Sequence, residues 1–91
     1  MVKAVRFGPH AVKKFDDLGR YNVTVTREQV EEAVSKPDYR EAGKKGRMIA
    51  TRGFTAHLVL RVIYRETDEA FEIVTFYPGR RSRYEDPVRQ G

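Results

Sequence analysis

Cysteine is absent from this 91-residue chain, so neither a disulfide nor a thiolate metal site can form. Long apolar runs are absent as well, because segments such as Leu58–Leu60 are far shorter than the about 20 residues of a membrane span. The opening residues, Met1 to Arg6, lack the apolar stretch of a secretion signal. Together these absences predict a cytoplasmic protein that has no membrane partner.

The motifs of several enzyme classes are also missing. The chain has no serine-nucleophile motif and no dinucleotide fingerprint, and segment Gly43–Gly46 lacks the glycine spacing of a phosphate-binding loop. The two histidines, His10 and His57, have no acidic or cysteine partner at the spacing of a metal site. We therefore expect no metal and no cofactor.

The composition is that of a folded domain, with 40% hydrophobic and 34% charged residues. Ninety-one residues are enough for one domain and too few for two. No internal repeat or linker interrupts the chain. We expect a single domain over residues 1–84 and a flexible C-terminal tail over residues 85–91.

The first part of the chain predicts an edge strand followed by a helix. Residues Val2 to Phe7 alternate weakly, and Gly8 then precedes Pro9, which suits a first helical turn because its missing N–H would be unpaired there. Gly19 is placed to end this helix. The apolar positions of the helix recur at helical spacing: Ala11, Phe15 and Leu18.

A second helix has the clearest local signal. Thr26 can cap its start, and Gln29 three residues later completes a capping box. Val25 before the cap and Val30 after it form a hydrophobic staple. The helix is expected to end before Pro37.

Three β-like runs follow a polar segment, Pro37 to Gly46, which we expect to be a loop. The runs cover residues 48–52, 56–66 and 71–77. A turn centred on Asp68-Glu69, in a loop of two or four residues, would pair the last two runs. This register matches charged with charged and apolar with apolar residues. Its pairs are Arg65 with Glu72, Tyr64 with Ile73, and Ile63 with Val74.

Alternation along these runs separates two faces of the sheet. The face expected to meet the helices carries Leu58, Leu60, Val62, Tyr64, Ile73, Thr75 and Tyr77. The order β-α-α-β-β-β then predicts an α+β fold with two short helices packed on one face of a small antiparallel sheet.

The opposite face of the sheet mixes apolar and basic side chains. Its expected members are His57, Val59, Arg61, Ile63, Arg65, Glu72, Val74 and Phe76. One interpretation is a nucleic-acid platform on which bases stack on Phe76 while arginines meet phosphates. The other is a half-exposed face covered by a dimer partner, a loop or the tail.

Basic residues dominate the charge balance, which is +5, and arginine outnumbers lysine twelve to six. Arginine forks bind phosphate in a bidentate manner and stack on bases. The residues that could grip a nucleic acid in this way are Arg80, Arg81, Arg83 and Tyr84 after the last strand, with Lys44 and Lys45 in the predicted loop. The alternative is a solvated charged tail.

Either histidine, His10 or His57, could act as a general acid or base, because histidine titrates near neutrality. Each could equally be a structural residue.

Four short segments together resemble the small family known as domain of unknown function 4258. They are Phe7–Ala11, with its Gly-Pro-His-Ala opening, Thr26–Val30, Lys36–Asp38 and Ile73–Pro78. That family is thought to be similar to the RelE/ParE superfamily of toxin–antitoxin modules. The resemblance implies a RelE-like fold and an activity on RNA, as a ribonuclease or as a ribosome-associated mRNA interferase.

The resemblance also implies residue roles. Arg61 would stabilise the phosphorane, and His57 or Tyr77 would transfer protons. His10, the family-motif residue, would be catalytic or would anchor the first helix. The first helix departs from the family pattern, because it has Lys13 and Lys14 where arginines are common.

Three hypotheses follow for the partners of the chain. A RelE-like toxin would act on RNA or the ribosome and be neutralised by an antitoxin protein. A non-catalytic module would bind nucleic acid with a steep salt dependence. A protein-interaction subunit would bury its second sheet face in a homodimer or against a partner helix.

Overall fold

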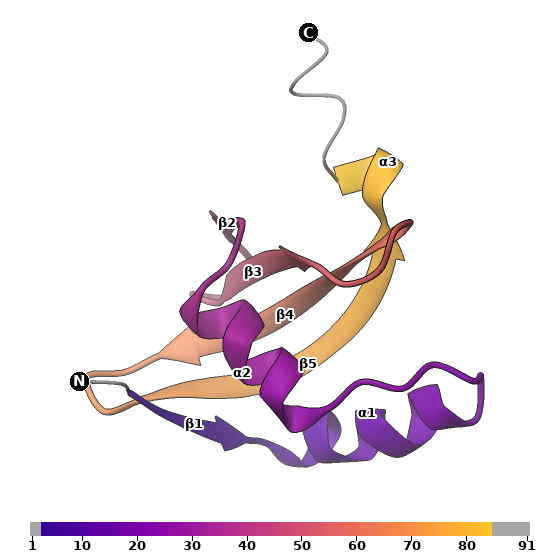
Figure 1. Cartoon of the computed structure of the whole chain (residues 1–91). Helices are drawn as coiled ribbons and strands as arrows, with labels where there is room; N and C mark the ends of the chain where they lie inside the picture. Colours follow the sequence, from indigo (N-terminus) through magenta and orange to yellow (C-terminus); the bar gives the residue numbers. More distant parts are fainter. Residues whose placement is uncertain (1–2, 85–91) are drawn as a thin grey trace, which may run out of the picture.

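The computed structural model describes residues 3–84, which form a five-stranded sheet with two longer helices on one face (Figure 1). In chain order the elements are β1 (Ala4–Phe7), α1 (Pro9–Gly19), α2 (Arg27–Ser35), β2 (Tyr39–Ala42), β3 (Met48–Gly53), β4 (Leu58–Glu66), β5 (Ala70–Arg80) and α3 (Arg81–Tyr84). The predicted α+β class is confirmed. The tail predicted over residues 85–91 lies outside the described residues.

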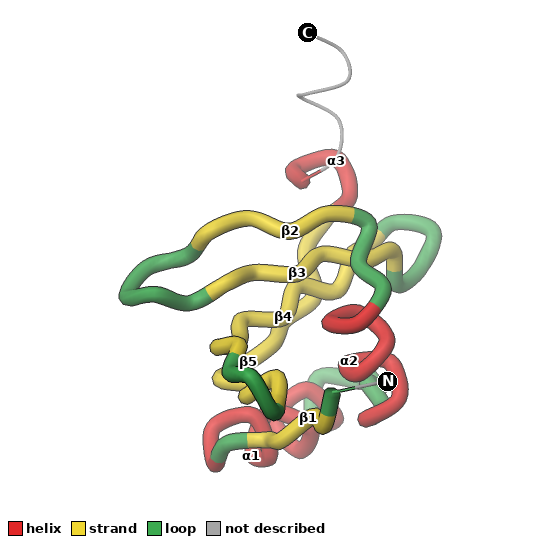
Figure 2. The backbone as a smooth tube through the Cα atoms, turned by 90° about the vertical axis from the view of Figure 1, so that its left-hand side faces the viewer, coloured by secondary structure: helices red, strands yellow, loops and turns green. Residues whose placement is uncertain are grey.

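The strands lie in the order β1-β5-β4-β3-β2, which can be followed from bottom to top in Figure 2. Strands β2 to β5 are antiparallel neighbours, whereas β1 pairs in parallel with β5. The prediction of an antiparallel sheet is therefore wrong at this edge. The chain leaves β1 through both helices before it enters the meander, and a crossover of this kind can bring the strands together in parallel.

Strand β2 was not predicted, because its segment reads as a polar loop. Its residues pair with β3, with Tyr39 opposite Thr51 and Ala42 opposite Met48. The turn between them closes with a hydrogen bond from the Gly43 N–H to the Arg47 carbonyl at 2.8 Å. An edge strand needs few apolar side chains, and β2 is mostly exposed, so periodicity could not reveal it.

Both predicted helices are confirmed. Pro9 occupies the first turn of α1, and Gly19 is its last residue. In α2 the capping box is complete, because Thr26 Oγ1 accepts from the Gln29 N–H at 3.1 Å and Gln29 Oε1 accepts from the Thr26 N–H at 2.8 Å. Helix α1 packs on β5 and β1, and α2 packs on β4 and β3.

The hairpin of β4 and β5 contains a bulge that changes which side chains face the helices. The predicted turn at Asp68-Glu69 and the pairs of Arg65 with Glu72 and Tyr64 with Ile73 are confirmed. The next pair is wrong, because Ile63 lies opposite Thr75 and Val74 is the extra residue. Because a bulge adds one residue, the side chains that follow it along the strand lie on the opposite face from the one that regular alternation predicts.

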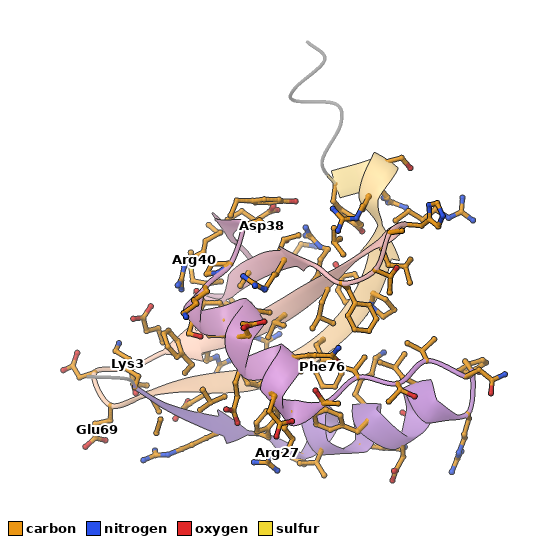
Figure 3. All side chains as sticks on the ribbon, in the orientation of Figure 1. Lys3, Arg27, Asp38, Arg40, Glu69 and Phe76 are labelled. Carbon is orange, nitrogen blue, oxygen red and sulfur yellow. The ribbon has the colours of Figure 1, made fainter. Side chains whose placement is uncertain are left out.

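Three predicted face assignments therefore change, those of Thr75, Phe76 and Tyr77. Phe76 lies opposite Val62, is fully buried and has its ring centroid 4.7 Å from that of Phe15 on α1, so it belongs to the core (Figure 3). Tyr77 lies opposite Arg61 and points away from the helices. Phe76 is thus not available to stack on bases as predicted.

The core fills the space between the helices and this face of the sheet. Its largest fully buried side chains include Tyr64, Phe76, Leu60, Ile73, Val30 and Val34. The Tyr64 ring packs edge-on against Phe71, and its hydroxyl accepts a hydrogen bond from Arg40 at 2.7 Å. None of the helices within residues 3–84 has the length and apolar character needed to cross a bilayer.

Candidate functional site

The sheet face turned away from α1 and α2, here called the open face, carries two groups of arginines. Strand pairing places Thr51, Arg61 and Tyr77 side by side on neighbouring strands at the end near α3. It places Arg65 and Arg6 beside Glu72 at the end near β1. Two predicted site residues, Arg61 and Tyr77, are thus brought together, and Arg65 is separated from them.

The first group is the Arg61 cluster, which consists of Arg61, Tyr39, Glu41, Thr51, Tyr77 and Tyr84. Arg61 Nε donates to the Tyr77 hydroxyl at 3.0 Å. Its Nη1 donates to Thr51 Oγ1 at 3.1 Å and reaches the Tyr39 hydroxyl at 3.5 Å. Its Nη2 lies 3.6 Å from Glu41 Oε1. Acceptors therefore surround the guanidinium, which is only 5% exposed.

Burial and hydrogen bonding act in opposite directions on this guanidinium. Desolvation alone would lower the pKa of Arg61, but the hydrogen bond to Tyr77 and the nearby Glu41 carboxylate outweigh it, so its pKa is raised. Arg61 consequently stays charged at every pH at which the protein is folded. A fixed charge of this kind can orient a phosphate, but it cannot exchange protons.

The short helix α3 covers the Arg61 cluster. The Tyr84 ring lies over Arg61, with the guanidinium carbon 4.1 Å from the ring centroid. Gly79 makes this close approach possible, because a β-carbon there would collide with the Tyr84 ring. Arg81 donates from Nε to the Thr55 carbonyl at 2.8 Å, and its backbone N–H donates to the His57 carbonyl at 3.0 Å, which fixes α3 to the β3–β4 loop. Any ligand of Arg61 must therefore displace Tyr84.

The second group, here called the arginine pocket, surrounds a hollow of about 360 Å³ between β1, the start of α1 and strands β3 to β5. Its polar lining residues are Arg6, His10, Arg47, Arg65 and Glu72. Within residues 3–84, none of the three guanidinium groups makes a side-chain hydrogen bond or an ion pair. The Nε of Arg47 is buried without a protein acceptor. This pocket thus joins two predicted residues, His10 and Arg65, which the Arg61 cluster excludes.

The other predicted site residues remain scattered. His57 is exposed in the β3–β4 loop, and its imidazole makes no hydrogen bond or ion pair with residues 3–84. Lys44 and Lys45 are exposed at the turn between β2 and β3, and Arg80 and Arg83 are exposed at the end of β5 and in α3. These side chains add positive charge to the surface but belong neither to the Arg61 cluster nor to the arginine pocket.

Several residues of both groups escaped the sequence reasoning. Tyr39 and Glu41 lie on the unpredicted strand β2, so no pattern linked them to Arg61. Thr51 is 1% exposed and could have been paired with Arg61 once the β3–β4 register was known. Arg6 could be assigned to the pocket only once the parallel pairing of β1 was known, and Arg47 only once the position of the β2–β3 turn was known.

In the part of the chain that the structure describes, no group of three or more His, Cys, Asp or Glu side chains is placed to hold a metal ion. Comparison of the chain with protein-family models, with curated proteins and with solved structures gives no match.

Proposed function

We propose that this chain is a RelE-like module of the toxin type that acts on RNA in the cytoplasm, with the open face as its RNA-binding surface. The observation that carries the proposal is the Arg61 cluster, in which one permanent cation lies among tyrosine hydroxyls and one carboxylate. The resemblance of four segments to the family of unknown function similar to the RelE/ParE superfamily supports the same reading.

RNA cleavage without a metal has three requirements that this cluster could meet. A base takes the proton of the 2′-hydroxyl, whose oxygen then bonds to the adjacent phosphorus. A cation stabilises the phosphorane, and an acid gives a proton to the leaving 5′-oxygen as its bond to phosphorus breaks. In the proposal Glu41 is the base, Arg61 the phosphate stabiliser and Tyr77 the acid. The products are a 2′,3′-cyclic phosphate and a 5′-hydroxyl.

The exposure of these groups fits their proposed roles. The Glu41 side chain is 46% exposed and makes the longest contact of the cluster, so a phosphate could replace it at Arg61. Tyr77 is half-buried, and its hydroxyl oxygen accepts from Arg61 Nε, which leaves its own O–H free to donate to a leaving oxygen. His57 and His10, which sequence reasoning offered for proton transfer, lie outside the cluster and are not assigned a role in it.

The test is an incubation of the purified chain with single-stranded RNA in the presence of a chelator of divalent ions, and a separate incubation with translating ribosomes in magnesium-containing buffer. We expect cleavage that Glu41→Gln and Tyr77→Phe each slow by about 10²- to 10⁴-fold, as loss of a general acid or base does. Tyr21→Phe, at a tyrosine 78% exposed outside the sheet, is the matched control and should cleave normally.

Expression in bacteria gives a second readout. The wild-type chain should arrest growth, and Arg61→Lys should relieve the arrest because an ammonium group lacks the planar fork. Normal growth at high levels of folded wild-type protein, together with intact RNA in the cleavage assay, would contradict the proposal. Arrest that an adjacent small protein relieves would support an antitoxin partner.

A second candidate function is non-catalytic RNA binding. The observation that favours it is that the donors of Arg61 already have protein acceptors, whereas the side chains of Arg6, Arg47 and Arg65 have none among residues 3–84. This function predicts salt-dependent binding of intact RNA. The protein-interaction hypothesis has less support, because the large apolar side chains that are strongly exposed within residues 3–84 are Val12 and Tyr21, outside the sheet.

A further inference from the structure

We propose that the arginine pocket is a second RNA subsite, which holds one phosphate group and the nucleoside attached to it. The inference rests on the proposed action on RNA and adds a binding site separate from the Arg61 cluster. Three observations carry it: uncompensated guanidinium groups, a buried donor without an acceptor, and an apolar wall beside them.

The charge arrangement of the pocket is unfavourable without an anion. Strand pairing places Arg6 and Arg65 on either side of Glu72. Met48 pairs with Tyr64, so Arg47, one residue before Met48, lies alongside Arg65. Three positive charges thus share one carboxylate, and none lies within ion-pair distance of it. Arg6 and Arg65 each lie opposite Glu72, but Arg47 and Arg65 are like charges opposite one another, which destabilise a sheet, and a bound phosphate would reduce this repulsion.

Arg47 adds a specific donor. Its Nε is buried, although the residue as a whole is half-buried, and it has no acceptor in the described part of the chain. A buried donor without an acceptor carries a desolvation penalty, which a ligand oxygen can cancel. Arginine Nε and Nη groups together form the planar fork that matches two phosphate oxygens.

The start of α1 faces the same hollow and also favours an anion. Gly8 is the N-cap residue and has no side chain to satisfy the first-turn N–H groups. Its own N–H is already used, because it donates to the Ile73 carbonyl at 3.0 Å and ties the helix start to β5. Gly8, Pro9 and His10 line the pocket, so the positive end of the helix dipole and His10 lie at its rim.

The apolar wall indicates a nucleoside in addition to a phosphate. Pro9 and Val74 line the pocket beside the arginines, whereas the ring of Phe7, which also borders the pocket, packs against Phe15 on the helix side. Val74 is the bulge residue of β5, and bulges commonly redirect a side chain at a functional site. Bases pack on surfaces of this kind without sequence preference.

The pocket and the Arg61 cluster can belong to one RNA path. Arg61 and Arg65 are four residues apart on β4 and share the open face, which places them about 13 Å apart at the usual strand rise. An RNA strand that crosses the face along β4 would pass both groups. Arg6 and Arg65 are exposed at the pocket, whereas Tyr84 covers Arg61, so this end can bind before Tyr84 moves at the other end.

Fluorescence anisotropy with a six-nucleotide single-stranded RNA, measured over a range of salt concentrations, tests the subsite. Arg6→Gln and Arg65→Gln should each weaken binding about tenfold at low salt and lower the slope of log K against log salt by about 0.7. Arg20→Gln removes the same charge at the C-cap of α1, on the helix side, and should change affinity less than twofold. Circular dichroism confirms that all three variants are folded.

A second arm separates an RNA phosphodiester from a free nucleotide. Adenosine 5′-monophosphate is titrated into the isotope-labelled chain, and the amide signals of Gly8, His10 and Val74 are followed by NMR. Shifts at these amides that Arg65→Gln abolishes would support the pocket for nucleotides in general. Loss of RNA binding in the pocket variants without nucleotide-induced shifts would support an RNA-specific subsite.

The outcomes distinguish this inference from the proposed function. If the wild-type chain binds RNA and the pocket variants behave like Arg20→Gln, the subsite is overturned and the action on RNA stands. If the wild-type chain binds no RNA but the nucleotide shifts Gly8 and Val74, the pocket stands as a nucleotide site and the RNA function is overturned. If neither probe binds, both fail.

Discussion

The replacement Phe76→Ala tests the bulge that separates the two sides of the sheet. Phe76 is fully buried opposite Val62 and against the ring of Phe15. Without the bulge at Val74, its side chain would lie on the open face, where truncation would cost little. The bulge therefore decides whether Tyr77 or Phe76 lies opposite Arg61.

The expected loss is large because the truncation creates a cavity in a thin core. A buried Phe→Ala change costs about 3 to 5 kcal/mol. A chain of this length has a total stability of about 5 to 14 kcal/mol, so the truncation removes a large fraction of it. The midpoint of thermal unfolding should fall by at least about 12 °C, from the usual 4 to 8 °C per kcal/mol in a domain of this size.

Urea unfolding followed by circular dichroism measures the change, with Tyr77→Phe as the comparison. That variant removes one hydroxyl and leaves Arg61 Nε without its acceptor, at about 1 to 2 kcal/mol. A Phe76→Ala loss below 1.5 kcal/mol, together with a larger loss for Tyr77→Phe, would refute the bulged register. Equal urea slopes in both variants show that the unfolded states are comparable.

Three further changes have defined outcomes. Arg61→Met should cost about 2 to 4 kcal/mol in urea unfolding because it leaves the buried Thr51 hydroxyl without its donor partner, and an unchanged midpoint would contradict the cluster geometry. Thr26→Ala should cost about 1 kcal/mol by loss of the capping box, whereas Thr26→Ser should restore it. Gly79→Ala should displace the Tyr84 ring, so that the Arg61 Nε–H exchanges faster in NMR spectra; unchanged exchange would show that α3 does not protect Arg61.

The helices could be predicted because their signals are local. The capping box of Thr26 and Gln29 involves residues three apart, and Pro9 and Gly19 act through their own backbone preferences. The turn at Asp68-Glu69 was predicted from the matching of side chains within one hairpin. None of these inferences needs a partner distant in the sequence.

The errors concern interactions that are not local. A bulge inserts one residue without altering the local propensity of its strand, so Ile73, Val74 and Thr75 read as regular alternation. Strand β2 is polar, so only its pairing with β3 identifies it as a strand. The direction of β1 relative to its neighbour depends on where β5 lies. The site residues inherited these errors: Phe76 was assigned to the wrong face, and Glu41 was missed.

The two arginine groups of the open face differ in a way that assigns them different steps. Arg61 is held by Tyr77 and Thr51 beneath Tyr84, so a ligand must replace existing contacts to reach it. Such a group can be selective, because only a ligand already positioned nearby gains enough contacts to displace the cover. Arg65 and Arg6 in the arginine pocket are exposed and can contact an anion directly. Capture at the pocket would raise the local concentration of the same strand at Arg61, and the pocket variants should therefore weaken binding while an Arg61 variant should mainly alter what happens after binding.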